Sequence, residues 1–240
     1  MQFDSSTIGI VAVSGAALLL TALSVYYSHI ILPQKTNKAY RKSIAAIAAA
    51  VESRDPSASG QARTVARFSC EVAQHLGLTG KDLERIEFAG LLMDIGKAQV
   101  PHTVLTKNEK LDRDEWRIVR NHCRIGAEIV ADVPFLADLA SIILYHHEYF
   151  NGEGYPFGLS GSDIPIASRI LHVVGDYVAM VAERPYHKQK LAAYEAADEI
   201  VKQTGRKYDP QVAKVFMRFL GYGSNAFDGY AGDESEALVR

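Results

Sequence analysis

The stretch Thr64–Leu76, T-V-A-R-F-S-C-E-V-A-Q-H-L, decides the fold class of this chain of 240 residues. Its apolar residues Val65, Phe68 and Val72 recur every three to four positions, which is the spacing of one face of an α-helix. Gly77 follows directly, and glycine commonly ends a helix. The stretch is therefore predicted to be an amphipathic helix with one face in a protein core.

The same helical spacing recurs along the chain, whereas the alternation of a half-buried β-strand is nearly absent. We therefore expect an all-α fold. Pro165 and Pro210 stand where the start of a helix tolerates proline. The predicted helices are Leu83–Met93, Arg113–Ala131, Leu136–His147, Ile166–Ala182, Leu191–Gln203 and Pro210–Phe219.

The composition is that of an ordinary globular protein, with 48% hydrophobic residues, 22% charged residues and a formal net charge of −2. No run of Lys or Arg is interleaved with aromatic residues, so a nucleic-acid duplex is not an expected partner. Cys70 and Cys123 do not have C-x-x-C spacing. We expect both to be small buried apolar residues in a reducing compartment.

An apolar segment precedes the helical domain. From Ile8 to Leu32 the chain has no Asp, Glu, Lys or Arg, and as a helix this length crosses a hydrocarbon core of about 30 Å. The alternative is a cleaved signal peptide, because Ala22-Leu23-Ser24 resembles a cleavage site. Residues 1–7, however, lack Lys and Arg. A single-pass anchor is favoured, and Lys35, Lys38, Arg41 and Lys42 then predict a cytoplasmic C-terminal domain.

Composition divides the chain into four parts. They are a transmembrane anchor (1–33), a juxtamembrane helix and hinge (34–55), the main helical domain (56–220) and a flexible tail (221–240). In the second part, Thr36–Arg54 carries Ile44, Ile47 and Val51 at helical spacing. This helix either packs on its own domain or pairs with a second chain, so a homodimer is one of two open readings.

Tyr145–Pro156, Y-H-H-E-Y-F-N-G-E-G-Y-P, is a candidate metallohydrolase site. Imidazole and carboxylate groups are usual ligands of transition metals, and a Gly-Glu-Gly turn lets the backbone approach a ligand closely. If His146 and His147 both lie on a helix, their side chains diverge by about 100°. They would then serve two neighbouring positions, one for metal and one for substrate.

Two further segments carry polar groups that fit such a site. In M-D-I-G-K, Asp94 and Lys97 lie about one helical turn apart and can share one site, while Gly96 is a plausible helix stop. His122 lies in the middle of a predicted helix. A lone helical histidine is more often a satisfied or exposed residue than a ligand, so only the company of the other groups makes His122 a candidate.

Together these motifs resemble the HD-GYP family, a branch of the HD superfamily of metal-dependent phosphohydrolases. The resemblance runs from about Val51 to Phe219 and includes L-M-D-I-G-K, N-H-C-R-I-G, H-H-E-Y-F-N-G-E-G-Y-P, R-P-Y-H and Y-D-P. Family members hydrolyse cyclic di-GMP and related cyclic dinucleotides with a two- or three-metal iron or manganese centre in a helical bundle. The resemblance therefore implies a bacterial signalling protein, anchored here in the inner membrane.

The resemblance assigns roles residue by residue. Asp94 is similar to the metal-bridging carboxylate and Lys97 to a lysine that contacts the substrate phosphate or the centre; both are the catalytic candidates. His122, His146 and His147 are similar to metal or substrate imidazoles. The loop that ends in Gly-Tyr-Pro is implicated in substrate binding and in contacts with signalling proteins. The matching substrate positions are Gly152, Gly154, Tyr155, Pro156 and Arg184.

The chain departs from the family at three ligand positions. Gln61 and Met93 stand where the family has histidines, and Gly175 stands where it has a metal-binding aspartate. The glutamate that can hold a third metal falls near Ser57. A thioether is a soft ligand and Gln a weak neutral one, so we expect at most one iron or manganese ion per chain.

Loss of an ion has a direct consequence for catalysis. A two-metal site uses both ions to stabilise the attacking and leaving oxygens, so hydrolysis is expected to fall by orders of magnitude or vanish. His172 or Asp176 would replace a lost ligand only from a displaced position. The favoured function is binding of cyclic di-GMP, or docking of signalling proteins, by an impaired enzyme. An active phosphodiesterase with an altered metal centre and a purely structural interaction domain are the alternatives.

Overall fold

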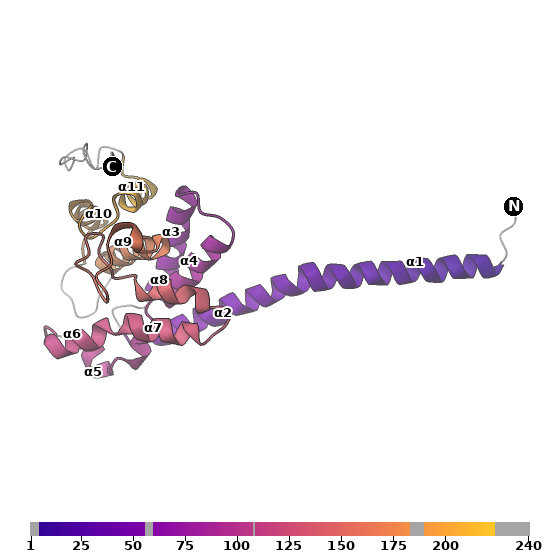
Figure 1. The fold of residues 1–240 in the computed structure, drawn as a ribbon, viewed down its shortest axis with the longest axis horizontal. Coiled ribbons are helices and arrows are strands. Elements are labelled where there is room, and N and C mark those ends of the chain that lie inside the picture. Colours follow the sequence, from indigo (N-terminus) through magenta and orange to yellow (C-terminus); the bar gives the residue numbers. More distant parts are fainter. Residues whose placement is uncertain (1–4, 56–59, 108, 183–189, 224–240) are drawn as a thin grey trace. The chain divides into compact units, whose positions relative to one another are not determined.

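The computed structural model describes residues 5–55, 60–107, 109–182 and 190–223 (Figure 1). Within these residues the chain is helical and forms no strand, apart from two isolated bridges, Asn151 with Ser160 and Thr204 with Tyr208. The predicted all-α fold is confirmed. Residues 56–59, which follow the expected hinge, most of the expected tail (224–240) and Arg184 lie outside the described residues.

The helices follow the apolar periodicity of the sequence closely. They are α1 (Ser5–Tyr26), α2 (Leu32–Glu52), α3 (Gln61–His75), α4 (Lys81–Leu92), α5 (His102–Leu105), α6 (Arg113–Arg120), α7 (His122–Ala131), α8 (Ala140–Leu144), α9 (Ile166–Val181), α10 (Ala193–Lys202) and α11 (Pro210–Phe219). A π-helical segment (Tyr27–Ile31) joins α1 to α2. Three short 3-10 segments occupy Ile95–Gln99, Ala137–Leu139 and Gly161–Asp163.

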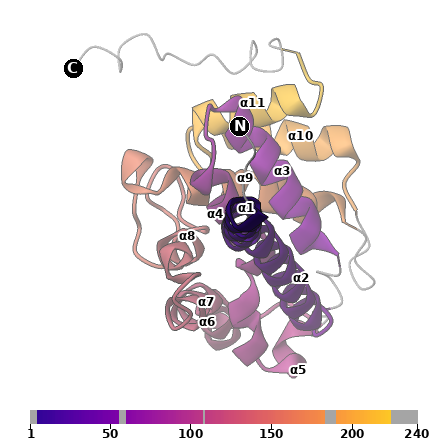
Figure 2. The ribbon, with the colours of Figure 1, turned by 90° about the vertical axis from the view of Figure 1, so that its right-hand side faces the viewer.

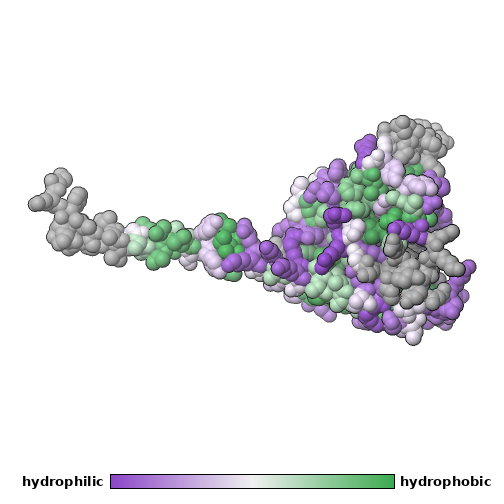
Figure 3. Space-filling model, turned by 180° about the vertical axis from the view of Figure 1, so that it is seen from behind, coloured by the Kyte–Doolittle hydropathy of each residue, from purple (hydrophilic) through white to green (hydrophobic). Residues whose placement is uncertain are grey.

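The chain separates into two compact units, residues 1–43 and 44–240. In the first unit, apolar side chains from Leu18 to Leu32 are exposed, and Figure 3 shows them as a green stretch of the N-terminal helix. Among the described residues, one helix, Ser14–Glu52, is long and apolar enough to cross a membrane. This agrees with the predicted anchor by length and composition, while the orientation stays a prediction.

The second unit is built around the predicted core stripe of α3. Val65 and Val72 are fully buried, and Phe68 packs against the same core. Helix α3 packs against α4 and α9, and α10 and α11 complete this end of the unit (Figure 2). Helix α7 packs against α8 and the 3-10 segment Ile95–Gln99 at the other end. The site residues lie on these last three elements or directly beside them.

Gly96 is not the helix stop that its position suggests, because α4 already ends at Leu92. A Cβ atom at Gly96 would lie 2.0 Å from the carbonyl oxygen of His122. The glycine is therefore required for close approach of the 3-10 segment to the first turn of α7. This approach brings the Asp94 region against His122.

Two predicted helices end earlier than the periodicity indicates. The predicted helix Arg113–Ala131 is divided at Asn121, so His122 opens α7 instead of lying in the middle of a helix. The predicted helix Leu136–His147 ends at Leu144, and His146 and His147 lie in the following turn. In both places a histidine ring donates to a carbonyl three residues earlier, which competes with helical backbone bonding.

Candidate metal centre

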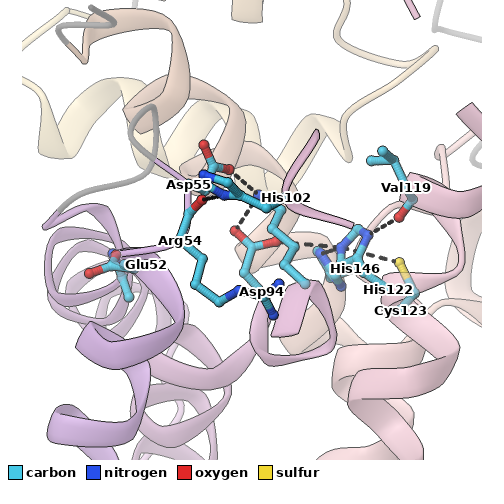
Figure 4. A network of polar contacts seen from close by, with 11 residues as sticks. Glu52, Arg54, Asp55, Asp94, His102, Val119, His122, Cys123 and His146 are labelled. Atoms are coloured by element: carbon cyan, nitrogen blue, oxygen red, sulfur yellow. Dashed lines mark hydrogen bonds and ion pairs between the residues drawn. The ribbon is translucent and has the colours of Figure 1, made fainter. Parts of the chain in front are cut away.

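Four side chains predicted as site residues converge in the second unit. His122 comes from the start of α7, and His146 and His147 from the turn after α8. Asp94 lies just before the 3-10 segment. Figure 4 shows Asp94, His122 and His146 directed toward one another. The structure therefore brings together residues that are far apart in the sequence.

The two most buried imidazoles of this cluster are held by backbone carbonyls. The Nδ1 atom of His122 lies 2.7 Å from the Val119 oxygen, and that of His146 lies 2.6 Å from the Ile143 oxygen. Because a carbonyl oxygen only accepts, each Nδ1 carries the proton and each Nε2 of the neutral ring presents a lone pair. The two Nε2 atoms are 3.4 Å apart. This is the orientation that metal-ligating histidines commonly have.

Burial keeps these imidazoles neutral. It lowers the pKa of His146 to about 3, with a further contribution from nearby His122. Burial also lowers the pKa of His122, although the Asp94 carboxylate opposes the shift. The pKa of His147 lies well below its ordinary value for the same reason, reinforced by His146. All three rings are therefore in the form that binds metal ions.

Asp94 links the imidazoles to Lys97. Its Oδ1 lies 3.4 Å from Nε2 of His122, and its Oδ2 lies 3.1 Å from Nζ of Lys97. Burial alone would raise the pKa of Asp94, but Lys97 and the histidines hold it at about 2. Lys97 also lies 3.4 Å from Asp55. The carboxylate is ionised, and the expected proximity of Asp94 and Lys97 is present.

Cys123 also belongs to the cluster, which the sequence did not indicate. It is buried, as expected, but its Sγ lies 3.6 Å from Nε2 of His122. One ligand atom from each of four residues lies within 4.8 Å of the others: His122, Cys123, His146 and His147. His146 and His147 do not diverge, since their ring centroids are 4.1 Å apart. Imidazole, thiol and carboxylate groups together fit a divalent transition-metal ion.

Met93 and Gly175, two of the positions expected to depart from the family pattern, lie next to each other. A Cβ atom built at Gly175 would lie 3.3 Å from Cε of Met93 and 3.7 Å from its Sδ. Met93 also lines a cavity of about 20 Å³ together with Gln61, Asp94 and Lys97. That volume is close to the space for one water molecule. Beside Asp94, the side chains of Gln61 and Met93 therefore leave room for about one water molecule.

The loop from Asn151 to Pro156 closes over the imidazole cluster. The Tyr155 ring stacks on His147 with centroids 4.9 Å apart. Two glycines permit this fold of the loop. A Cβ atom at residue 154 would lie 2.1 Å from the Tyr149 nitrogen, so only glycine fits there. Gly152 has a φ of +85°, a backbone conformation that glycine adopts readily. Glu148 accepts backbone hydrogen bonds from Phe157 and Gly158 at 2.7 and 3.0 Å. The Glu148 carboxylate thus stabilises the loop.

His172 and Asp176, the candidates to replace a lost ligand, form a neighbouring network. Nδ1 of His172 lies 2.8 Å from the Glu148 carbonyl, and its Nε2 lies 3.4 Å from Oδ2 of Asp176. The same carboxylate oxygen lies 2.6 Å from Nζ of Lys207 and accepts from the Tyr208 hydroxyl at 2.8 Å. Asp176 is therefore already neutralised by a lysine.

Comparison with known proteins identifies similar chains. The family model described as "HD domain" matches residues 45–212. The chain is 35% identical over 180 residues to the cyclic di-GMP phosphodiesterase response regulator RpfG of Xanthomonas campestris, covering 74% of this chain and 47% of that protein. It is 36% identical to a cyclic di-GMP phosphodiesterase of Thermotoga maritima, covering 70% and 46%. Identity to the 3'3'-cGAMP-specific phosphodiesterase 2 of Vibrio cholerae is 33%, covering 71% and 33%.

This chain spans about half or less of the length of these relatives. Two solved structures share the fold. The HDG"Y"P protein Bd1817 of Bdellovibrio bacteriovorus has a TM-score of 0.56 at 22% identity, covering 67% of this chain and 51% of that one. A cyclic GMP-AMP specific phosphodiesterase of V. cholerae has a TM-score of 0.60 at 18% identity, covering 79% and 50%.

Proposed function

Because this chain belongs to the HD domain family, we propose that it is a membrane-anchored, catalytically impaired HD-GYP protein that binds a cyclic dinucleotide. Several relatives are named as phosphodiesterases of cyclic di-GMP, and another as specific for 3'3'-cGAMP. These names support cyclic di-GMP as the first candidate ligand. The apolar N-terminal helix supports the anchor.

The contact between Met93 and Gly175 carries the proposal of impairment. The methyl group of Met93 lies 3.3 Å from the position that a Cβ atom at residue 175 would occupy. An aspartate at that position would require the Met93 methyl group to shift by a few tenths of an ångström, so the glycine leaves room for the methionine in its present position. A thioether is a poor ligand for iron or manganese. The space for a second ion is accordingly filled by a side chain that does not bind it.

The part of the centre around Asp94, His122 and His146 suits the binding of one metal ion and a phosphate group. Asp94, His122 and His146 would hold one ion, and Cys123 and His147 add further donors. A bound ion would supply positive charge toward phosphate oxygens. Lys97, whose pKa is raised because Asp94 and Asp55 outweigh the effect of burial, adds a fixed cation. One ion and one lysine suffice to bind a phosphodiester group. They do not provide the two ions that stabilise the attacking and leaving oxygens during hydrolysis.

An active phosphodiesterase with an altered metal centre is the second candidate. The observation that favours it is the presence of Cys123 among the imidazoles, because its sulfur would bind an ion that displaces the thiol proton, even though burial raises the pKa of this thiol. Docking of signalling proteins through the loop Gly152–Pro156 is compatible with either candidate. A purely structural interaction domain would make no use of the oriented imidazoles.

The deciding experiment measures metal content and turnover on the same sample. The full chain, solubilised in detergent and supplied with iron and manganese without oxygen, is analysed by elemental mass spectrometry and incubated with cyclic di-GMP. We expect one ion or none per chain, and binding by calorimetry without release of linear dinucleotide. Two ions per chain together with metal-dependent hydrolysis would overturn the proposal of impairment.

A further inference from the structure

A large open pocket lies beside the loop, outside the imidazole cluster. It has a volume of about 1000 Å³ and is lined by α6, the start of α7 and two loop residues, Tyr155 and Pro156. Its lining includes four arginines and one acidic residue, Asp114; the arginines are Arg113, Arg117, Arg120 and Arg124. The pocket is therefore strongly basic, although the whole chain carries a net charge of −2.

The arginines form a stripe because of their spacing. They recur every three to four positions, which places them on one face of the helical path of α6 and α7. The backbone bond from the Ile125 nitrogen to the Asn121 oxygen preserves this path across the division between the two helices. The arginines are not consecutive, so they do not stand out as a basic run in the sequence.

The charges of this stripe are only weakly compensated. Arg117 lies 3.3 Å from Asp114, but both side chains are more than four-fifths exposed, and such surface pairs contribute little. Among the described residues, no carboxylate forms an ion pair with Arg120 or Arg124. Arg120 instead lies 5.7 Å from the Trp116 ring centroid and 5.1 Å from that of Tyr155. Arg124 lies 5.7 Å from the Phe157 ring centroid, so both guanidinium groups are positioned on aromatic rings and can donate hydrogen bonds to anions.

Trp116 supplies the second chemical element of the pocket. Its side chain is 48% exposed and lines the pocket beside the arginines. An exposed indole offers a face on which a planar base stacks, and guanidinium forks bind phosphate oxygens. The combination matches one ligand class, a phosphorylated purine nucleotide. The volume of about 1000 Å³ lies at the upper end of the range for small-molecule sites, which favours a nucleotide over a membrane or protein surface.

We propose that this pocket is a second, metal-independent site for a phosphorylated purine nucleotide, with the base on Trp116 and the phosphate on Arg117 and Arg124. Tyr155 belongs to the wall of this pocket and also stacks on His147 of the metal centre. A nucleotide in the pocket therefore lies one side chain away from the centre. The site does not require an ion.

The test uses the fluorescence of Trp116, which is the only tryptophan of the chain. The full chain in detergent, with a chelator present, is titrated with GMP and with guanosine, and the signal is corrected for absorption by the nucleotide. We expect saturable quenching by GMP and about tenfold weaker binding of guanosine, because the phosphate contacts are lost.

Variants distinguish binding by this arginine stripe from a general effect of positive charge on the protein surface. The double variant Arg117→Gln, Arg124→Gln is expected to weaken GMP binding by about tenfold or more, whereas Arg218→Gln, an exposed arginine on α11, leaves it unchanged. Circular dichroism verifies that each variant is folded. Equal weakening by the control would mean that net charge, and not this pocket, binds the nucleotide.

Three other results would overturn the proposal: absence of quenching by GMP, quenching by phosphatidylglycerol vesicles but not by GMP, and quenching by an acidic peptide but not by GMP. The proposed function is distinguishable from this second site. If cyclic di-GMP binds only with metal present, and Trp116 does not respond, the second site is wrong while the proposed function stands.

Discussion

At the scale of single residues, the candidate centre is shaped by how each histidine is held. His122 and His146 both donate Nδ1–H to a carbonyl three residues earlier, so their Nε2 lone pairs face each other at 3.4 Å. Two facing lone pairs do not bond, and without a cation between them or beside them they gain nothing from this proximity. The arrangement is therefore better suited to the metal-bound protein than to the metal-free one.

This arrangement predicts acid sensitivity of the metal-free chain. Unfolded His146 binds a proton near its ordinary pKa of 6.5, whereas folded His146 does so only at about 3. Between these values the unfolded state binds more protons than the folded state. The free energy of unfolding therefore falls as the pH decreases, by up to ~1.4 kcal/mol for each pH unit from this residue. Asp94 acts at lower pH, since its stabilising charge is lost between 3.8 and about 2.

The measurement is urea unfolding of the chelator-treated chain in detergent at about pH 7 and about pH 5, within the window set by the reference pKa of histidine. We expect a clear loss of stability at the lower pH. The variant His146→Gln should reduce the dependence on pH. Equal stability at both values would contradict the buried, neutral state of these histidines.

The three positions proposed to have lost a metal ligand give a second prediction at this scale. The triple variant Gln61→His, Met93→His, Gly175→Asp should bind an additional ion and gain hydrolysis of cyclic di-GMP by ~100-fold or more, because a second ion contributes several kcal/mol and each ~1.4 kcal/mol is a factor of ten. Met93 must change together with Gly175, since its methyl group lies 3.3 Å from the new Cβ.

Elemental analysis and product chromatography test this gain. The single variant Gly175→Asp serves as the matched control, because it introduces the carboxylate but leaves the thioether against it. We expect no additional ion and no hydrolysis from the control. Hydrolysis by the unmodified chain at the level of the triple variant would show that Met93 does not impair the centre.

At the scale of secondary-structure elements, the approach of the segment Ile95–Gln99 to α7 positions the site. Gly96 permits this approach because its missing Cβ leaves room for the His122 carbonyl. Helix α6 begins with a capping box in which Asp112 and Glu115 bond each other's backbone nitrogens. Such local bonds fix where the helices begin, while the glycine fixes how closely they meet.

We therefore expect Gly96→Ala to be strongly destabilising. The added Cβ would lie 2.0 Å from a backbone oxygen, so the two elements must separate, at a cost of at least ~2 kcal/mol, and His122 would move away from Asp94. Urea unfolding and metal content are the two measurements. Gly223→Ala, at a position with open space around it, is the control and should be near neutral. Wild-type stability and metal content in Gly96→Ala would contradict the proposed packing constraint.

At the scale of the whole molecule, the chain consists of an apolar N-terminal unit and a helical domain with its own core. Exposed Leu18, Leu19 and Leu20 are out of place in water but suited to lipid. The domain holds both the candidate centre and the basic pocket. Attachment to a membrane would restrict where the domain meets its ligands without changing their chemistry.

The proposed anchor predicts how the chain behaves on cell fractionation. The full chain should remain with membranes after washes with high salt or alkaline carbonate, whereas deletion of residues 8–32 should release it to the soluble fraction. Replacement of the same residues by an unrelated apolar Ala-Leu segment is the control and should preserve membrane association. Release of the full chain by salt alone would exclude a spanning helix.

The local features could be predicted from the sequence because each depends on neighbouring residues. Apolar spacing identified the helices near α3, α4, α9 and α11, and the absence of charge identified the apolar segment. The proximity of Asp94 and Lys97 follows from their separation of about one turn. The ends of α6 and α8 were misplaced, because side-chain bonds to carbonyls compete with a periodicity that continues past them.

Only the tertiary structure decided which distant residues meet. Met93 lies 3.3 Å from the place that a Cβ atom at residue 175 would occupy, Cys123 lies in the same cluster as His146, and the α6 arginines line a pocket with Tyr155. A periodic pattern reports that one face of a helix is buried but not which residue of another helix covers it. Those partners depend on packing among elements separated by long stretches of chain. The residue types of the candidate centre could therefore be predicted from the sequence, while the proximity of Met93 to residue 175 and the basic pocket required the assembled fold.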